Sequence, residues 1–331
     1  MPNAVFDRPY TRRNDGRLRF LVCGLKVASD LPLPEAHPSG HEPASDDIDI
    51  NLLATSDGRP LPRDPLRHRS ARPSQPDIAA EPDGAHVLDW SGYVQVRIDA
   101  SLKSIALSST PDRLHLLPSI VMGWAIGYLL VLRGAVCLHG SVVRFRGRTV
   151  ALLGDSGTGK STLAAAAVRA GADLLSDDLV AFSDPRSSRS VAAGAATLRL
   201  TPETAEALGI GPDALKRPDG ADKLLWTPAR PAGTRPAAEP CHSADLDAIY
   251  LLANPTASDA DRHSFIIDER LAPGPALLGL IRACYPPGMP GLLGPAHLQG
   301  LGAIARTVPV RPLRHARRWR DLPHLVDAIL R

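Results

Sequence analysis

The sequence predicts an α/β protein in which a small β-rich N-terminal domain precedes a larger domain of alternating strands and helices. Three observations support this prediction. The chain has 331 residues, more than most single domains contain. Short strand patterns separated by turn residues fill the region 86–108. A buried strand, a glycine-rich loop and an alanine-rich helix follow one another at 149–171, as in a parallel α/β unit. We therefore place the two domains at 1–112 and 113–331.

Strand patterns dominate the N-terminal domain. They mark five segments, at 18–27, 47–53, 86–90, 93–98 and 104–108. Because the last three are separated only by turn residues, we expect them to form a β-meander. The region at about 54–86 is rich in Pro, Arg, Asp and Ser and predicts a long surface loop.

The second domain is expected to begin with a buried helix and to continue with strands and helices. The helix is expected at about 119–132, opened by Pro118, and its apolar run 120–132 is too short to span a bilayer. Further strands are expected at 135–145, 149–154, 173–182, 246–252 and 307–313, and further helices at 161–171 and 322–330.

Composition narrows the classes of function. The net charge is +3, and no dense basic block is interleaved with aromatic residues, so no nucleic-acid partner is expected. The basic residues within 314–320 predict the solvated face at the start of a helix, with an acidic partner as the alternative. The four cysteines are scattered without a CxxC pair, which argues against a zinc site and a disulfide framework and favours a cytoplasmic setting. The N-terminus lacks the apolar segment of a secretory signal, and no membrane partner is expected.

A phosphate-binding motif lies between the strand and the helix of the parallel unit. It reads Gly154-Asp155-Ser156-Gly157-Thr158-Gly159-Lys160-Ser161 and matches G-x-x-x-x-G-K-[ST]. Glycine-rich turns alone are common in α/β proteins, but the full motif in this context is specific. Its glycines let backbone N–H groups surround phosphate oxygens, and the helix N-terminus adds positive potential. Lys160 is expected to reach the β- and γ-phosphates of ATP, and Ser161 to ligate Mg²⁺.

Two adjacent carboxylates, Asp177 and Asp178, lie one helix beyond the motif. Parallel topology returns the chain beside Lys160 at this point. One carboxylate is expected to hold Mg²⁺ and the other to accept a proton from an incoming hydroxyl. Side chains of adjacent strand residues point to opposite faces unless the strand ends there, so the two should have different roles. The alternative is a solvated acidic turn.

His139 precedes the motif on an apolar strand. A lone histidine in such a strand is more often a core residue than a functional one. The following Gly140 indicates a bulge or a close approach of another backbone.

Together these three elements resemble the catalytic C-terminal domain of the HPr kinase/phosphorylase family. In that family a His-Gly pair precedes a GDSGxGKS loop, and an Asp-Asp pair follows the helix after it. Here the corresponding residues are His139-Gly140, the motif at 154–161 and Asp177-Asp178, at the family's spacing. The resemblance covers about 136–182. It implies the fold of P-loop kinases of the HPr kinase and phosphoenolpyruvate carboxykinase type, a mixed curved sheet with flanking helices.

The resemblance also implies roles for individual residues. Asp178 would be the general base, Lys160 and His139 would be catalytic, and Ser161 and Asp177 would contact Mg²⁺. The implied ATP-binding residues are those of the motif and the residue after it: Gly154, Asp155, Ser156, Gly157, Thr158, Gly159, Lys160, Ser161 and Thr162.

Two features depart from the family's bifunctional members. Those commonly carry Glu where this chain has Thr162, and their later glycine-rich phosphorylase signature has no counterpart here, which argues against reverse phosphorolysis. The N-terminal GLKVASDLPLPE resembles the HPr kinase-related proteins found beside lasso-peptide gene clusters. Some of those relatives phosphorylate the C-terminal serine of a precursor peptide.

Three functional hypotheses follow. The first is a Mg·ATP-dependent serine kinase acting on a protein or peptide, with lasso-type precursor peptides as one substrate class. The second is a nucleotide-gated binding protein or ATPase without phosphotransfer, and the third is an HPr kinase proper. Arg199, Glu203 and Lys223 are further candidates for a phosphate clamp or a metal ligand, with ordinary surface positions as the alternative. The resemblance also implies a homo-oligomer.

Overall fold

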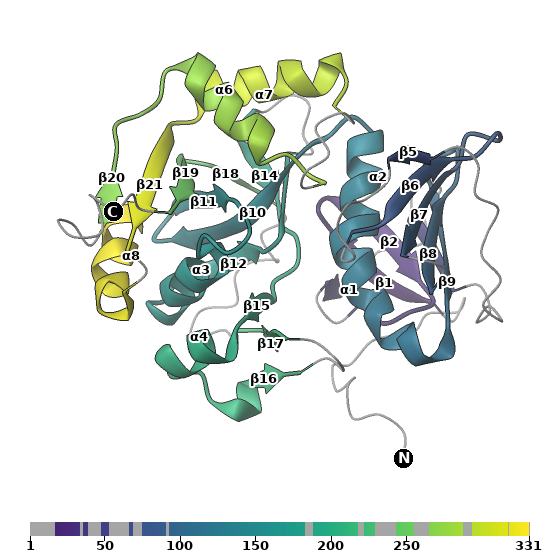
Figure 1. Cartoon of the computed structure of the whole chain (residues 1–331), viewed down its shortest axis with the longest axis horizontal. Coiled ribbons are helices and arrows are strands. Elements are labelled where there is room, and N and C mark those ends of the chain that lie inside the picture. Colours follow the sequence, from purple (N-terminus) through teal and green to yellow (C-terminus); the bar gives the residue numbers. More distant parts are fainter. Residues whose placement is uncertain are drawn as a thin grey trace. The chain divides into compact units, whose positions relative to one another are not determined.

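The computed structural model describes residues 17–33, 36–38, 48–52, 66–68, 75–90, 93–182, 188–217, 222–228, 243–254, 265–286, 293–316 and 318–330. The chain forms two compact units, Met1–Arg133 and Gly134–Arg331 (Figure 1). Each unit is built around its own β-sheet.

The described residues of the first unit form a nine-stranded mixed sheet in the order β3-β1-β2-β4-β9-β8-β7-β6-β5. Its strands are β1 (Leu18–Val22), β2 (Leu25–Ser29), β3 (His37–Pro38), β4 (Ile48–Leu52), β5 (Leu66–His68), β6 (Asp77–Ala80), β7 (His86–Trp90), β8 (Val94–Ile98) and β9 (Ser104–Ser109). Strand β4 pairs in parallel with β2 and β9, and the other pairs are antiparallel. The meander of β7, β8 and β9 is confirmed.

Two expectations for this unit are corrected. The single strand expected at 18–27 is a hairpin, because Cys23 and Gly24 have φ of 50° and 80° and turn the chain between β1 and β2. Strands β5 and β6 fall within the long loop expected at about 54–86. Residues 53–65 and 69–74 of that range lie outside the described residues. The apolar Ile78 of β6 is buried in the sheet, and the surrounding Pro- and Arg-rich composition conceals this short strand.

The helical segment Pro111–Leu132 completes the first unit. It comprises η1 (Pro111–Leu116), α1 (Leu117–Ile120), the π-helical turn η2 (Val121–Ala125) and α2 (Ile126–Leu132). Trp124 lies edge-on to Trp90 of β7, and the Tyr128 hydroxyl is 2.9 Å from Nδ1 of His86. Because the segment packs on this sheet, the unit boundary follows Arg133 rather than residue 112.

This segment is longer than the sequence indicated, because the 3₁₀ turn opened by Pro111 extends it to 22 residues. Among the described residues it is the one helical stretch long and apolar enough to cross a membrane by length and composition. Of its most apolar window, 56% is buried inside the protein, as in the core helix of a soluble domain.

The second unit is a mixed α/β unit with a curled sheet in the order β18-β14-β13-β10-β11-β19-β21-β20, and β12 also pairs with β10. Its strands are β10 (Val136–Phe145), β11 (Arg148–Gly154), β12 (Asp173–Ser176), β13 (Leu179–Phe182), β14 (Ser190–Ala192), β18 (Ser243–Asp245), β19 (Ala248–Ala253), β20 (Phe265–Ile267) and β21 (Val310–His315). Strands β11, β19 and β21 are parallel neighbours, so their carboxyl ends meet at one edge.

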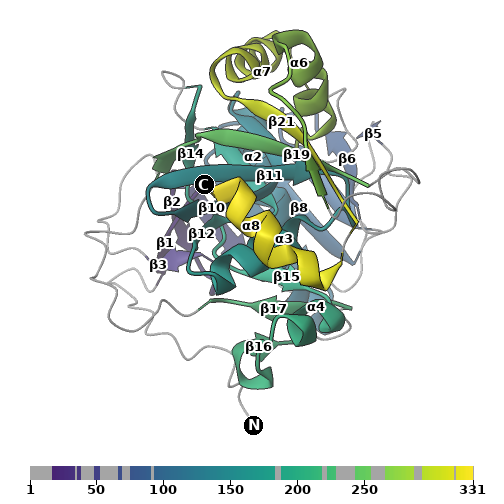
Figure 2. The same cartoon turned by 90° about the vertical axis from the view of Figure 1, so that its left-hand side faces the viewer.

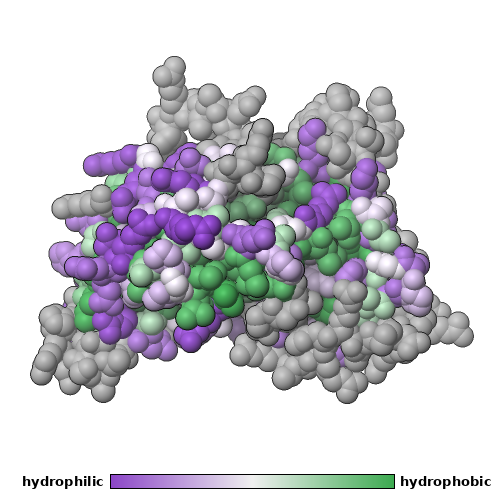
Figure 3. Space-filling view, turned by 90° about the horizontal axis from the view of Figure 1, so that it is seen from above, coloured by the Kyte–Doolittle hydropathy of each residue, from purple (hydrophilic) through white to green (hydrophobic). Residues whose placement is uncertain are grey.

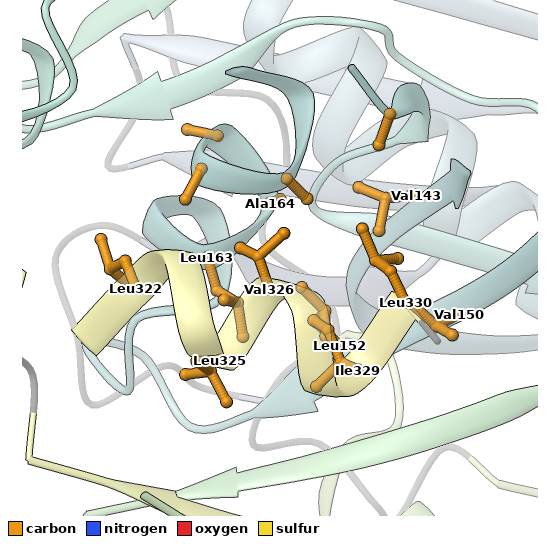
Figure 4. Close-up of a cluster of buried hydrophobic side chains, with 14 of the residues drawn as sticks. Val143, Val150, Leu152, Leu163, Ala164, Leu322, Leu325, Val326, Ile329 and Leu330 are labelled. Atoms are coloured by element: carbon orange, nitrogen blue, oxygen red, sulfur yellow. The ribbon is translucent and has the colours of Figure 1, made fainter. Parts of the chain in front are cut away.

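Helices cover both faces of this sheet (Figure 2). Helices α3 (Lys160–Arg169) and α8 (Leu322–Leu330) pack on one face, in a core that includes Val150 and Leu152 of β11 (Figure 4). Helices α6 (Pro273–Arg282) and α7 (Pro295–Thr307) pack on the other face, against Ala151 and Leu153. Alternate residues of β11 are thus buried on opposite sides, as in strands covered on both faces.

The structure corrects several boundaries in this unit. The strand expected at 173–182 is interrupted between β12 and β13, and helices α6 and α7 were not predicted. The strand expected at 307–313 is β21, which begins at Val310 because Thr307 ends α7. The basic cluster at 314–320 opens a helix only in its second half, where the exposed Arg318 precedes, and the exposed Arg320 belongs to, the 3₁₀ turn η5 (Trp319–Asp321) that leads directly into α8. Arg314 and His315 belong to β21, and residue 317 lies outside the described residues.

The side of the protein that carries α6 and α7 is mixed in hydropathy. Figure 3 shows hydrophobic and hydrophilic surface interspersed on this side. Leu278 of α6 and Leu298 of α7 are exposed, with relative exposures of 62% and 44%.

The packing of α8 predicts a stability change. Ile329 is fully buried in the core that α8 shares with α3. Ile329→Ala leaves a cavity and should lower the free energy of unfolding by about 2–5 kcal/mol, measured by urea denaturation. His324→Ala, on the exposed side of the same helix, is the matched control and should change it by less than about 0.5 kcal/mol. Equal effects of the two changes would contradict this packing.

Candidate functional site

The candidate site lies at the carboxyl end of β11, where the Gly154–Ser161 motif leads into α3. Gly154, Gly157 and Gly159 have φ of 148°, 81° and 95°. A Cβ on Gly154 would lie 2.5 Å from the carbonyl oxygen of Leu252 in β19. The glycines are therefore required by backbone conformation, and at Gly154 also by the neighbouring strand.

Lys160 begins α3 and is largely buried. Its Nζ donates hydrogen bonds to the carbonyl oxygens of Gly154 (2.7 Å) and Asp155 (3.0 Å). Burial lowers the pKa of this ammonium, although the nearby carboxylates act in the opposite direction. The lysine holds a positive charge against the inside of the loop, at the N-terminus of a helix, where an anion is favoured.

His315 supports the loop from β21, a role that the sequence analysis missed. Its Nε2 lies 3.0 Å from the carbonyl oxygen of Thr158 and therefore donates to it. A Cβ on Gly159 would lie 3.2 Å from the imidazole ring. The sequence analysis assigned this histidine to a solvated basic cluster, yet it is 95% buried (5% exposed). Its position two residues after the apolar Leu313 was the available signal, because both residues lie on one face of the strand.

Asp177 and Asp178 lie in a tight turn centred on Asp178. Strand β12 ends at Ser176 and β13 begins at Leu179. Asp178 has a left-handed φ of 64°, and the Leu179 N–H donates to the Asp177 carbonyl at 2.8 Å, closing a three-residue turn. The two carboxylates consequently have different surroundings.

Asp177 is buried and directed toward the start of α3. Its Oδ1 accepts a 2.5 Å hydrogen bond from the Ser141 hydroxyl, and the Ser161 hydroxyl lies 3.4 Å from both of its carboxylate oxygens. Burial, together with the negative charge of Asp178, raises the pKa of Asp177 to about 7. A buried carboxylate that faces a hydroxyl is a fitting environment for a divalent cation.

The donor set at this point fits Mg²⁺ in particular. Within the described parts of the chain there is no group of three or more His, Cys, Asp or Glu side chains that could hold a metal. Mg²⁺ is usually held by one or two protein carboxylates, with waters and substrate phosphates completing its shell. Asp177 and Ser161 would supply the protein's share, beside the loop whose residue pattern predicts phosphate binding.

Asp178 faces a different set of partners. Arg199 of β15 (Leu198–Leu200) pairs with it, with Nη1 3.1 Å from Oδ2. Burial acts to raise the pKa of Asp178, but the charges of Arg199, Lys223 and Lys160 outweigh burial and lower it. The group is therefore a carboxylate held in an ion pair with Arg199.

His139 and Gly140 hold the turn in place. Nδ1 of His139 donates to the Asp178 carbonyl at 3.0 Å, and the Gly140 N–H donates to the same oxygen at 3.3 Å. Burial and the charge of Lys160 lower the pKa of His139, so the imidazole is neutral with Nε2 unprotonated. A Cβ on Gly140 would lie 2.5 Å from the Leu152 carbonyl oxygen, so only glycine allows this approach.

The remaining predicted residues are distributed around this centre. Asp155, Ser156 and Gly157 are exposed on the loop. The Thr162 hydroxyl lies 3.3 Å from that of Thr204 in α4 (Pro202–Ala207) and joins the two helices. Glu203 is exposed on the first turn of α4 and is not brought to the site by any described contact.

Ser141 is a second residue that the sequence analysis missed. It is fully buried beside the His139-Gly140 pair, and it holds the carboxylate of Asp177. A hydroxyl between the His139-Gly140 pair and the apolar Val142 and Val143 was the signal that could have identified it.

Comparison with known proteins assigns no family. No protein-family model and no curated protein matches the chain. Among solved structures, the Hpr(Ser) kinase/phosphatase from Coxiella burnetii matches 59% of this chain and 93% of that chain, with 12% identity and a TM-score of 0.29. A functional assignment therefore depends on the site residues themselves.

The burial of Asp177 predicts a pH effect on stability. Its folded-state pKa of about 7 lies above the usual value of 3.8, so stability contributed at low pH is lost as the pH rises toward 7. In metal-free protein, Asp177→Asn should remove this loss and be more stable than the wild type by about 1–3 kcal/mol at pH 8, but not at pH 4.

Urea unfolding in a chelator at the two pH values measures this difference. Asp173→Asn, which changes a more exposed carboxylate on the neighbouring strand, is the control and should show no such gain. Destabilisation by Asp177→Asn at the higher pH would contradict the environment described for Asp177.

Proposed function

We propose that this protein is a Mg·ATP-dependent kinase that phosphorylates a serine hydroxyl on a protein or peptide. The observation that supports it best is the turn centred on Asp178, which directs the carboxylates of Asp177 and Asp178 toward different neighbours. One carboxylate faces the Ser161 hydroxyl at the start of α3, and the other faces the cationic groups beyond the turn. A simple nucleotide switch has no need for the second carboxylate.

Each residue has a defined task in this proposal. The backbone N–H groups of the Gly154–Ser161 motif and the ammonium of Lys160 bind the phosphates. Ser161 and Asp177 hold Mg²⁺. When bound, Mg·ATP supplies the phosphoryl group that is transferred, and catalysis consists of positioning and electrostatic stabilisation.

The acceptor side of the site is organised around Asp178. Its carboxylate accepts the proton of the serine hydroxyl as that oxygen attacks. Neutral His139 fixes the Asp178 backbone through the carbonyl oxygen and so positions the base. We propose phosphoryl transfer from ATP to serine without the reverse phosphorolysis, because bifunctional members of the resembled family commonly carry Glu at the position of Thr162. Here the Thr162 hydroxyl joins α3 to α4 instead.

The ion pair between Arg199 and Asp178 favours one second candidate, a nucleotide-gated binding protein without phosphotransfer. In that case the carboxylate would serve only to hold Arg199. The two functions differ in what happens to labelled ATP. A kinase transfers the labelled phosphate to serine, whereas a nucleotide-gated binding protein releases free phosphate or leaves ATP intact.

Replacement of the proposed base gives the most specific activity test. Asp178→Asn should lower transfer of label from γ-labelled ATP to serine peptides, or to purified HPr, by about 10²–10⁴-fold, because no carboxylate takes the hydroxyl proton. ATP affinity should change by only a few fold. Phosphoserine formed at the wild-type rate by this variant would exclude Asp178 as the base.

Removal of the Ser161 hydroxyl tests the Mg²⁺ position. Ser161→Ala should weaken ATP binding about tenfold when Mg²⁺ is present, because one oxygen ligand is lost. The same titration in a chelator, by calorimetry, is the internal control and should show no difference from the wild type. Equal weakening in both solutions would contradict a metal contact at Ser161.

A further inference from the structure

A small antiparallel sheet beside the site has two chemically different faces. It consists of β15, β16 (Leu215–Lys216) and β17 (Leu224–Trp226) in the order β15-β17-β16. One face packs into the core that contains α3, and it is formed by Leu198, Leu200, Leu215, Leu224 and Trp226. This apolar face fixes the sheet on the second unit.

The opposite face is cationic. In the strand register Arg199 and Lys216 both lie opposite Leu225, so the three side chains form a row across the sheet. Lys223 lies in the bend that leads into β17, two residues before Leu225. Lys216 and Lys223 are exposed, and Leu225 is half-buried between the basic groups.

This cationic face, defined by Arg199, Lys216 and Lys223, begins at the proposed catalytic base. Arg199 contacts Asp178 directly. The charge of Lys223 acts on the pKa values of Asp178, His139 and Lys160, which places it near the same centre. Lys216 lies two strands from Arg199, which is about 10 Å at the usual strand spacing.

Charge and position together indicate the occupant. The phosphate groups of a nucleotide would lie at the motif before α3, whereas the cationic face extends away from Asp178 on another sheet. An extended peptide advances about 3.3 Å per residue, so Lys216 would meet a side chain about three residues from the acceptor serine. Leu225 would contact the aliphatic part of the residues between them.

We propose that the cationic face binds an acidic peptide segment that flanks the acceptor serine. This inference rests on the proposed function for the identity of the acceptor. When the segment binds, its carboxylate takes Arg199 as a partner in exchange for Asp178. The exchange frees the Asp178 carboxylate to accept the serine proton, so an acidic acceptor also activates the base.

Peptide binding can be measured without phosphotransfer. The probes are two labelled nine-residue peptides with a central serine, one with Glu and one with Gln three residues to either side. With a non-hydrolysable ATP analogue and Mg²⁺, fluorescence anisotropy should show the Glu peptide binding about five- to tenfold more tightly. The difference should shrink as salt is raised from about 0.05 M to about 0.5 M.

Charge reversal identifies the surface that binds the peptide. Lys216→Glu should remove the preference for the Glu peptide. The matched control Lys26→Glu makes the same charge change at an exposed position of the first unit, and it should retain the preference. Both variants are checked for ATP binding and for thermal unfolding.

Three results would overturn the proposal. They are equal affinity for the two peptides in the wild type, an undiminished preference in Lys216→Glu, or loss of ATP binding by Lys216→Glu in step with loss of the peptide. Displacement of the Glu peptide by short RNA as readily as by unlabelled peptide would also contradict an acidic-peptide surface. Because none of these readouts requires phosphorylation, a failure here is distinct from a failure of the kinase assignment.

Discussion

The site depends on one backbone feature, the three-residue turn centred on Asp178. A continuous strand would place Asp177 and Asp178 on opposite faces of the sheet, with one of them in an apolar core. The turn keeps both carboxylates at the same edge but gives them different neighbours. The Asp178 carbonyl accepts hydrogen bonds from His139 and Gly140, and this pair holds the left-handed φ of 64°.

The same feature explains how two adjacent carboxylates acquire different proton affinities. Asp177 is buried beside another negative charge and has a raised pKa, whereas cationic groups lower that of Asp178. Environments that separate the pKa values of neighbouring groups are typical of sites with divided chemical roles. The apolar packing on both faces of the sheet keeps these environments fixed, because α3 and β11 cannot shift without opening a core.

The sequence was sufficient where local chemistry determines local structure. The motif at 154–161 and its flanking elements could be read from residue types. So could the two alternatives at Asp177, a continuous strand or the end of a strand. Arg199 and Lys223 could be named as candidates, but their position near Asp178 arises from strand pairing between distant segments. His315 and Ser141 were missed because their roles depend on contacts with residues that are remote in sequence.

Helices α6 and α7 show a second reason for missed structure. Their glycines suggest loops, yet a Cβ on Gly279 would lie 2.4 Å from Leu251, and one on Gly300 would lie 2.6 Å from Val136. These glycines allow the helices to approach the sheet closely, a reason that a single sequence does not reveal.

The domain boundary was misplaced for a related cause. The apolar helix 111–132 packs on the preceding sheet, and apolarity alone does not say which sheet a helix covers.

A paramagnetic metal distinguishes the roles of the two carboxylates. Mn²⁺ can replace Mg²⁺, and its electron paramagnetic resonance spectrum reports the protein ligands of the ion in the presence of ATP. Asp177→Asn should alter the spectrum and weaken Mn²⁺ binding, whereas Asp178→Asn should leave both as in the wild type. Equal effects of the two substitutions, or an effect of Asp178→Asn alone, would contradict this division of roles.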